Sequence, residues 1–395
     1  MPSIRDFTFG PWRAVLVLGV TQILAWGALF YPVVLTVPLI AAERGWSLTF
    51  TMSGFSLGLL AAGFAAPTIG RQIDRHGGHM VMPWGALAGA AALLGLAATE
   101  HPLAFLALWA VMGVAMASSL YDPAFATLGR IFGAKARRPI TALTLAGGFA
   151  STVSWPVTHL CLAHWGWRGT YLFYAALLAI VAAPLLAFVL PRQRAEPTAP
   201  STDPQRTAPV YLPARGRAFL LVAAAFAAYL FVPAALSAHL LAMFERLGLE
   251  RTTAVTIGAL FGPAQVAARI GEFTLASNVH PLGVARFAVG LICAAFVLLA
   301  AAGASPLVAA IFAVAYGAAN GLMTIARGTL PLALFGPAGY GALIGRIAKP
   351  GLIIQSAAPL LVALVIERAS DAAALALLAA MVTLSLVAFA LIRRP

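Results

Sequence analysis

Three charged residues, Asp122, Arg269 and Lys349, lie inside long apolar runs, where an ionised side chain is costly to bury. Asp122 lies about ten residues from one end of its run and the other two about eight, so all three share a layer roughly 12–15 Å deep. Two cations and one anion in one layer favour an anionic ligand. The planar fork of Arg269 suits a carboxylate, and Asp122 is a candidate proton carrier.

Polar side chains at a similar depth would orient a bound anion; they are Tyr121, Gln265, Tyr316, Asn320 and Gln355. Other pairings remain open. Arg269 has Glu272 three residues further on, within reach of an internal ion pair, and Asp122 and Lys349 are able to pair with each other. His239 is a second candidate for proton coupling, because histidine titrates near neutral pH.

The elements that position these residues span a membrane. The chain is 62% hydrophobic and 9% charged, with a mean hydropathy of +0.93, which soluble domains do not reach. The pattern predicts an all-α membrane protein with twelve transmembrane helices. Arg327, near one end of the tenth run, is expected to extend to the interface. The runs cover 13–41, 48–69, 80–99, 103–131, 139–163, 170–190, 218–243, 252–275, 282–302, 306–334, 341–366 and 372–392.

The formal net charge of +13 follows topology rather than a nucleic-acid surface. With the N-terminus in the cytoplasm, most of the 25 Lys and Arg residues fall in cytoplasmic loops. We therefore expect a multi-pass protein of a bacterial cytoplasmic (inner) membrane with both termini cytoplasmic. The lipid bilayer is then its surroundings, and nucleic acid is not a partner.

The chain divides into two similar halves. A Pro-, Thr- and Ser-rich stretch at 192–217 predicts a cytoplasmic linker between six-helix bundles at 1–191 and 218–395. Phe132, Gly133, Gly148 and Pro156 recur 203 residues later as Phe335, Gly336, Gly351 and Pro359. Because six helices precede the duplicate, the bundles are expected to be related by a pseudo-two-fold axis along the membrane normal.

The hydrophilic stretch "GRQIDRHGGH" joins the second and third runs. In it, Gly70 would permit close helix approach, Asp74 and Arg75 would pair with helix ends, and Gly77 would supply a turn. This stretch resembles the signature loop of the major facilitator superfamily. The resemblance implies that Asp74 latches the cytoplasmic side closed, with Gly70, Arg75 and Gly77 as the other elements of this gating loop.

A second resemblance concerns the monocarboxylate transporter branch of that superfamily. It rests on "LYDPAFATLGRIFGAKARRPITALTLAGGFAS", "GWRGTYLF" and "GPAQVAARIGEF". The resemblance implies that Arg269 is the substrate and coupling residue. Animal members of the branch have an aspartate where this chain has Gln265, and a lysine in helix 1 that is lacking in "VTQILAWGALFYPVV". The aspartate and lysine that relay the proton in those members therefore have no counterparts in this chain.

These observations predict a secondary active transporter of a small organic anion, with a monocarboxylate favoured, coupled to protons and working by rocking-type alternating access. One chain is expected to suffice as a monomer. Export of hydrophobic or toxic compounds is the alternative, and a transporter-like sensor ranks lower. No zinc, nucleophile-elbow or phosphate-loop motif occurs, so we expect neither an enzyme nor a cofactor or metal.

Overall fold

A computed structural model describes residues 10–192, 211–303 and 305–393, so most of the expected linker lies outside the described residues. Side-chain caps mark several helix starts: the hydroxyls of Ser47, Ser305 and Ser370 accept hydrogen bonds from backbone amides three residues on. Helices dominate the described part of the chain, as the apolar runs predict.

The first half consists of helices with breaks and one 3-10 turn. Its elements are α2 (Arg13–Leu29), α3 (Val33–Arg44), α4 (Leu48–His76), α5 (Gly78–Ala98), α6 (Pro102–Ser119), α7 (Tyr121–Phe132), η1 (Gly133–Lys135), α8 (Arg137–Gly148), α9 (Ala150–Ala176), η2 (Leu177–Ala182) and η3 (Leu185–Val189).

The second half contains longer helices. They are α10 (Arg217–Arg246), α11 (Arg251–Gly258), α12 (Phe261–Thr274), α13 (Pro281–Ala302), α14 (Pro306–Phe335), α15 (Tyr340–Arg368) and α16 (Asp371–Ala390). Together α11 and α12 occupy the run at 252–275, interrupted near Leu260.

Ten helical segments of the described chain are individually long and apolar enough to cross a membrane. One of them, Arg137–Val189, is 53 residues long and bends at Gly166, where φ is 64°. It therefore contains two crossings, and α11 with α12 supplies another. The described residues thus form the expected twelve crossings, six in each half.

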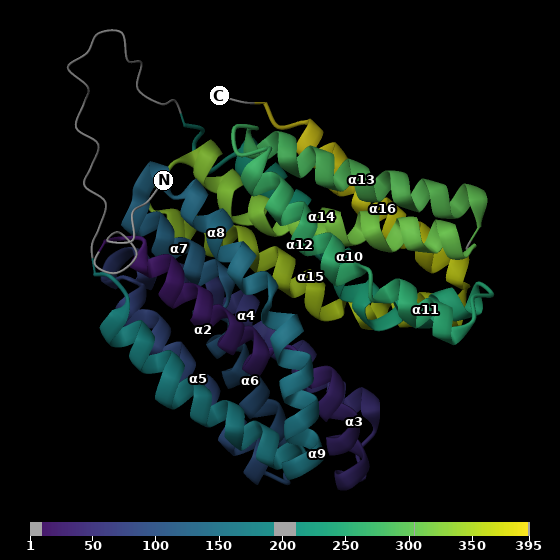
Figure 1. Cartoon of the computed structure of the whole chain (residues 1–395), viewed down its shortest axis with the longest axis horizontal. Helices are drawn as coiled ribbons and strands as arrows, with labels where there is room; N and C mark the ends of the chain where they lie inside the picture. The colour runs from purple at the N-terminus through teal and green to yellow at the C-terminus, as the bar shows by residue number, and fades with distance from the viewer. Residues whose placement is uncertain (1–9, 193–210, 304, 394–395) are drawn as a thin grey trace.

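The two halves form separate groups of helices. In Figure 1 the purple-to-teal helices of the first half meet the green-to-yellow helices of the second at one end. The groups diverge toward α3 and α11. We call the meeting end, where α4 ends and α15 begins, the latch end.

The repeat detected in the sequence has a backbone counterpart. Gly133 and Gly336 follow α7 and α14, the fourth crossing of each half, with positive φ angles of 56° and 79°. Glycine reaches such angles without the steric cost that other residues incur. The offset of 203 residues therefore marks the same helix-ending device in both bundles.

The α4–α15 contact holds the bundles together at the latch end, and glycines allow it. A Cβ atom on Gly70 would lie 2.0 Å from the carbonyl oxygen of Gly341, and one on Gly345 would lie 2.2 Å from that of Ala66. Backbones this close leave no room for any side chain at Gly70 or Gly345.

We predict that Gly345→Ala destabilises the protein by about 1–3 kcal/mol, because the added methyl group forces the two backbones apart. Gly290→Ala on α13 is the matched control, since a Cβ atom there meets nothing within 4 Å. Chemical unfolding in detergent measures both variants. Equal stability of the two would contradict the importance of this contact.

Candidate functional site

Arg269 on α12 is buried at the junction of the two bundles, with 3% of its surface exposed. Its Nη1 donates to the carbonyl of Thr144 on α8 at 2.7 Å, and its Nη2 donates to the hydroxyl of Thr324 on α14 at 3.3 Å. Its Nε is buried and has no hydrogen-bond partner among the described residues. No carboxylate in the described ranges forms an ion pair with it. Arg269 thus retains an uncompensated charge and an unused donor.

The paired glycines of α8 make room for this guanidinium. A Cβ atom on Gly148 would lie 2.6 Å from Nη1 of Arg269, and one on Gly147 would lie 2.4 Å from the hydroxyl of Tyr121. Any larger residue at Gly148 would displace the arginine. The small-residue character of this helix therefore shapes the site as well as the packing.

Tyrosines of both halves lie close to Arg269. The Tyr121 hydroxyl on α7 and the guanidinium face adjacent glycines of α8, Gly147 and Gly148. From the second half, Tyr229 on α10 donates to Asn320, whose backbone carbonyl accepts from Thr324, a contact of Arg269. The arginine therefore lies near tyrosine hydroxyls from both halves.

Helix breaks place several of these groups. Tyr31 lies between α2 and α3, and Tyr121 follows the break at Leu120 between α6 and α7. Backbone carbonyls left unpaired inside a membrane need a substitute partner. The side-chain amide of Gln22 supplies it, donating to the carbonyls of Ser119 at 2.7 Å and Leu120 at 3.2 Å. Gln22 thereby fixes the backbone that carries Tyr121.

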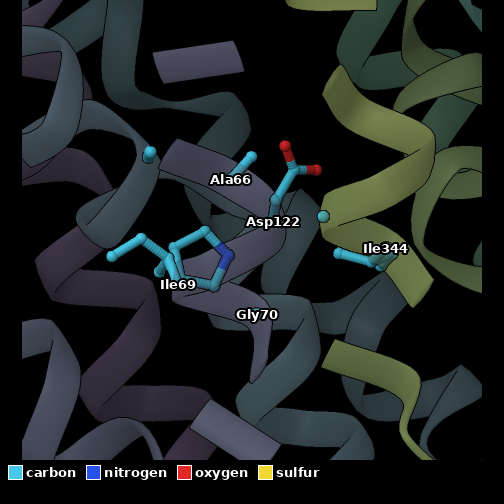
Figure 2. A pocket seen from close by; sticks show the side chains of 8 residues that line it. Ala66, Ile69, Gly70, Asp122 and Ile344 are labelled. Carbon is cyan, nitrogen blue, oxygen red and sulfur yellow. The ribbon is translucent and has the colours of Figure 1, made fainter. Parts of the chain in front are cut away.

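Asp122, the next residue, pairs across the bundles with Arg327 on α14, at 2.5 Å between Oδ2 and Nη2. The sequence left pairing with Lys349 open and expected Arg327 to extend to the interface; both expectations are wrong, because Arg327 turns inward. Oδ1 of Asp122 is buried and unpaired. Figure 2 shows the carboxylate between Ala66 of α4 and Ile344 of α15. These residues border a cavity of about 10 Å³, close to the room that one water needs.

The expected gating loop forms a contact between the halves. Asp74, in the last turn of α4, accepts hydrogen bonds from the backbone amides of Gly341 at 2.8 Å and Ala342 at 2.7 Å, in the first turn of α15. A carboxylate at a helix N-terminus is stabilised by the helix dipole. Arg130 on α7 also donates to the carbonyl of Asp74. The latch end is therefore closed in this structure.

The other members of that loop differ in their roles. Gly77 takes a φ of 88°, which ends α4 and turns the chain into α5. Arg75 was expected to pair with a helix end, but it is exposed, and Arg130 occupies that position instead. Arg75 therefore does not make the expected helix-end contact in this closed state, because it lies exposed at the surface.

A second ion pair crosses the bundles at the latch end. Arg137, at the start of α8, contacts Glu272 on α12, at 3.1 Å between Nη2 and Oε1. The same atom lies 3.3 Å from the carbonyl of Ala276. The internal Arg269–Glu272 pair that the sequence left open is therefore absent, because Glu272 is already paired. Asp122 and Glu272 each neutralise another arginine, and neither compensates Arg269.

The polar residues expected around the anion are only partly gathered. Asn320 accepts a hydrogen bond from the hydroxyl of Tyr229 at 3.3 Å. Its carbonyl accepts from Thr324, a contact of Arg269. Tyr316 is buried and packs on Phe261, with ring centroids 4.7 Å apart.

Four further candidates contribute less. Gln265 is partly exposed, and its backbone lies against Gly321. The ammonium of Lys349 lies 4.8 Å from the ring centroid of Phe64, without an ion pair in the described residues. Gln355 is partly exposed. A ring nitrogen of His239 already hydrogen-bonds the carbonyl of Pro359 at 2.9 Å.

Several contributors escaped the sequence analysis. Tyr31 and Gln22 lie in or beside an apolar run with no motif to mark them, and Arg137 and Arg130 resemble ordinary basic residues at helix ends. The helix breaks that make them important leave weak sequence signals. The sequence did contain one indication of the Asp122–Arg327 pair: both residues lie within apolar runs, where a charged side chain needs a partner of opposite charge.

Comparison with known proteins agrees with this architecture. The family model of the Major Facilitator Superfamily matches residues 15–348. The chain belongs to the Major Facilitator Superfamily. The predicted superfamily and the two-bundle fold are thereby confirmed.

Two curated relatives of this superfamily chain have names that refer to anions. Mouse (Mus musculus) monocarboxylate transporter 4 is 26% identical over 334 residues, covering 80% of this chain and 68% of the relative. A probable anion transporter 2, chloroplastic, from Oryza sativa subsp. japonica is 32% identical over 150 residues, 35% of this chain and 26% of that protein.

Solved structures of superfamily members share the fold. The human organic anion transporter MFSD10 (TETRAN) has a TM-score of 0.73 at 16% identity, covering 96% of this chain and 99% of that one. The proton:xylose symporter XylE has a TM-score of 0.71 at 13% identity, covering 95% and 94%. At these identities the likeness concerns the fold alone.

We predict that Asp74→Asn opens the latch end. A maleimide probe would measure this opening through the thiol that Thr144→Cys introduces, in a background with Cys161 and Cys293 replaced by serine. Thr144 is fully buried, and charge-assisted hydrogen bonds contribute about 1.5–3 kcal/mol, so labelling should accelerate roughly tenfold or more.

Asp371→Asn is the control for this experiment, because Asp371 pairs with Arg246 within the second bundle. Its labelling rate should match that of the parent protein. Equal labelling of the Asp74 and Asp371 variants would show that Asp74 does not hold the bundles together.

Proposed function

We propose that this protein is a secondary active transporter of a small organic anion, with a monocarboxylate as the favoured substrate and protons as the coupling ion. Arg269 binds the carboxylate. The observation that carries this proposal is the buried guanidinium of Arg269, which lies between the bundles with an unused donor and without a carboxylate partner among the described residues.

The charge distribution supports an anion rather than a neutral substrate. Arg137 and Arg327 are neutralised by Glu272 and Asp122, whereas Arg269 is not. A buried unpaired charge is costly, and an anionic substrate removes that cost when it binds. The names of the monocarboxylate and anion transporters among the relatives agree with this substrate class.

Asp122 is the proposed proton carrier. Its pairing with Arg327 crosses the bundles, so protonation of the carboxylate weakens a contact that holds the halves in one arrangement. His239 is a weaker candidate, since its ring is engaged by Pro359. Proton binding and bundle movement are then coupled through one ion pair.

Transport follows from rocking of the two bundles. We place the latch end on the cytoplasmic side of a bacterial inner membrane, in accordance with the basic residues of the loops. The structure then represents an outward-facing state. Substrate enters between the diverging bundles, and release to the cytoplasm requires the Asp74 and Glu272 contacts to separate.

Export of hydrophobic or toxic compounds is the second candidate. The partly exposed aromatic residues Trp26, Phe30 and Phe55 favour it, because they would accommodate an apolar compound without any charge. Transport by an exporter of this kind would not depend on Arg269.

We predict that Arg269→Gln lowers uptake of labelled carboxylates into proteoliposomes by roughly 10- to 150-fold, the equivalent of about 1.5–3 kcal/mol. Arg269→Lys should retain only part of the wild-type uptake, since an ammonium cannot donate two parallel hydrogen bonds to a carboxylate as a guanidinium does. Arg251→Gln is the control, because the side chain of Arg251 is 85% exposed. Uptake that is equal in the Arg269 and Arg251 variants would overturn the anion site.

We predict that Asp122→Asn abolishes stimulation by an inward proton gradient while carboxylate exchange at equal pH continues. Because Asp122→Asn leaves the buried charge of Arg327 without a partner, the double variant Asp122→Asn/Arg327→Gln tests the role of Asp122 with both charges of the pair removed. Exchange and gradient-driven uptake are measured on the same vesicles. Gradient stimulation that persists in both variants would exclude Asp122 as the proton carrier.

A further inference from the structure

We propose that the carboxylate substrate carries an aromatic ring, which binds on a cluster of aromatic side chains beside Arg269. This inference rests on the proposed function, because it adds a subsite for the apolar body of the anion. The cluster, termed the ring subsite, consists of Trp26, Phe30, Tyr31, Phe55 and Tyr121.

The ring subsite is continuous and begins at the anion site. The ring of Tyr121, whose hydroxyl faces Gly147 next to the Gly148 that Arg269 faces, lies 5.3 Å from that of Trp26. Trp26 lies 5.0 Å from Phe30, which in turn lies 5.3 Å from Phe55. Edge-to-face and tilted arrangements at these centroid distances are favourable for aromatic groups. A ligand that extends from Arg269 would therefore meet aromatic surface.

The rings of this subsite are unlike the core aromatic residues of the same bundle. Trp26, Phe30 and Phe55 retain partial exposure, whereas Phe105 and Trp109, which also contact one another, are 1% exposed. Part of the surface of these three rings is therefore left uncovered by the protein. Because the rings continue from Tyr121, a ligand held at Arg269 is the occupant that we infer for this surface.

The indole nitrogen of Trp26 is already used within the protein. It donates to the side chain of Gln22 at 3.2 Å, and the phenylalanines of the subsite have no polar side-chain atoms. The remaining surface of these rings is apolar. It therefore discriminates between a phenyl group and a methyl or hydroxyl group by stacking and apolar burial, not by hydrogen bonds.

The test compares uptake of matched acids that differ only in the ring: acetate with phenylacetate, and pyruvate with phenylpyruvate. The wild type in proteoliposomes should show a KM about tenfold lower for each phenyl acid, in the range of ring stacking plus apolar burial. Trp26→Leu should raise the KM for phenyl acids about three- to tenfold more than it raises the KM for methyl acids.

Two further variants separate substrate binding from folding. Trp26→Phe keeps a ring and should restore most of the preference for phenyl acids, which a purely structural role of Trp26 would not require. Trp84→Leu is the control for loss of an indole, because Trp84 on α5 is 70% exposed and outside the ring subsite. It should behave as the wild type.

The outcomes distinguish this inference from the function on which it rests. Uptake of carboxylates that depends on Arg269 but shows equal KM values for phenyl and methyl acids overturns the ring subsite and leaves the anion transporter intact. The same holds if Trp26→Leu affects both acids equally. Absence of flux for every carboxylate overturns both proposals.

Discussion

The arrangement of this protein depends on the burial of one positive charge. A guanidinium inside a membrane protein is stable only where hydrogen bonds and an opposite charge replace its hydration. Arg269 donates hydrogen bonds to Thr144 of one bundle and Thr324 of the other, but no carboxylate among the described residues pairs with it. The guanidinium therefore bridges the two halves without a neutralising carboxylate. In the function that we propose, an anionic substrate supplies the missing negative charge and so links its binding energy to the relative position of the bundles.

The helices bend where this charge requires room. Paired glycines on α8 leave space for the guanidinium and for the hydroxyl of Tyr121. The break before Tyr121 leaves backbone carbonyls that Gln22 satisfies from another helix. Unwound backbone at membrane depth is tolerated only where protein or a polar cavity replaces water. The breaks are thus part of the site rather than defects in the helices.

Contacts between the bundles are concentrated at the latch end and combine two kinds of interaction. Gly70 and Gly345 allow the backbones of α4 and α15 to touch. Asp74 then caps the start of α15, and Glu272 pairs with Arg137 at the start of α8. In each case a carboxylate near the end of one helix meets the beginning of a helix in the other bundle. Such contacts are specific but individually small, as the proposed rocking of the bundles would require of an interface that separates.

The sequence by itself determined the membrane-spanning character, the twelve crossings and the two similar halves, and it pointed to Arg269 as a charge within an apolar run, because hydropathy, repeats and the cost of buried charge are local properties. Tertiary structure alone decided the partners. Asp122 pairs with Arg327, 205 residues away, and Glu272 with Arg137, 135 residues away. The choice between candidate partners depends on helix rotation, on breaks such as that at Leu120 and on glycine contacts. Those features emerge only when helices from both halves pack together, so spacing along one helix could not supply them.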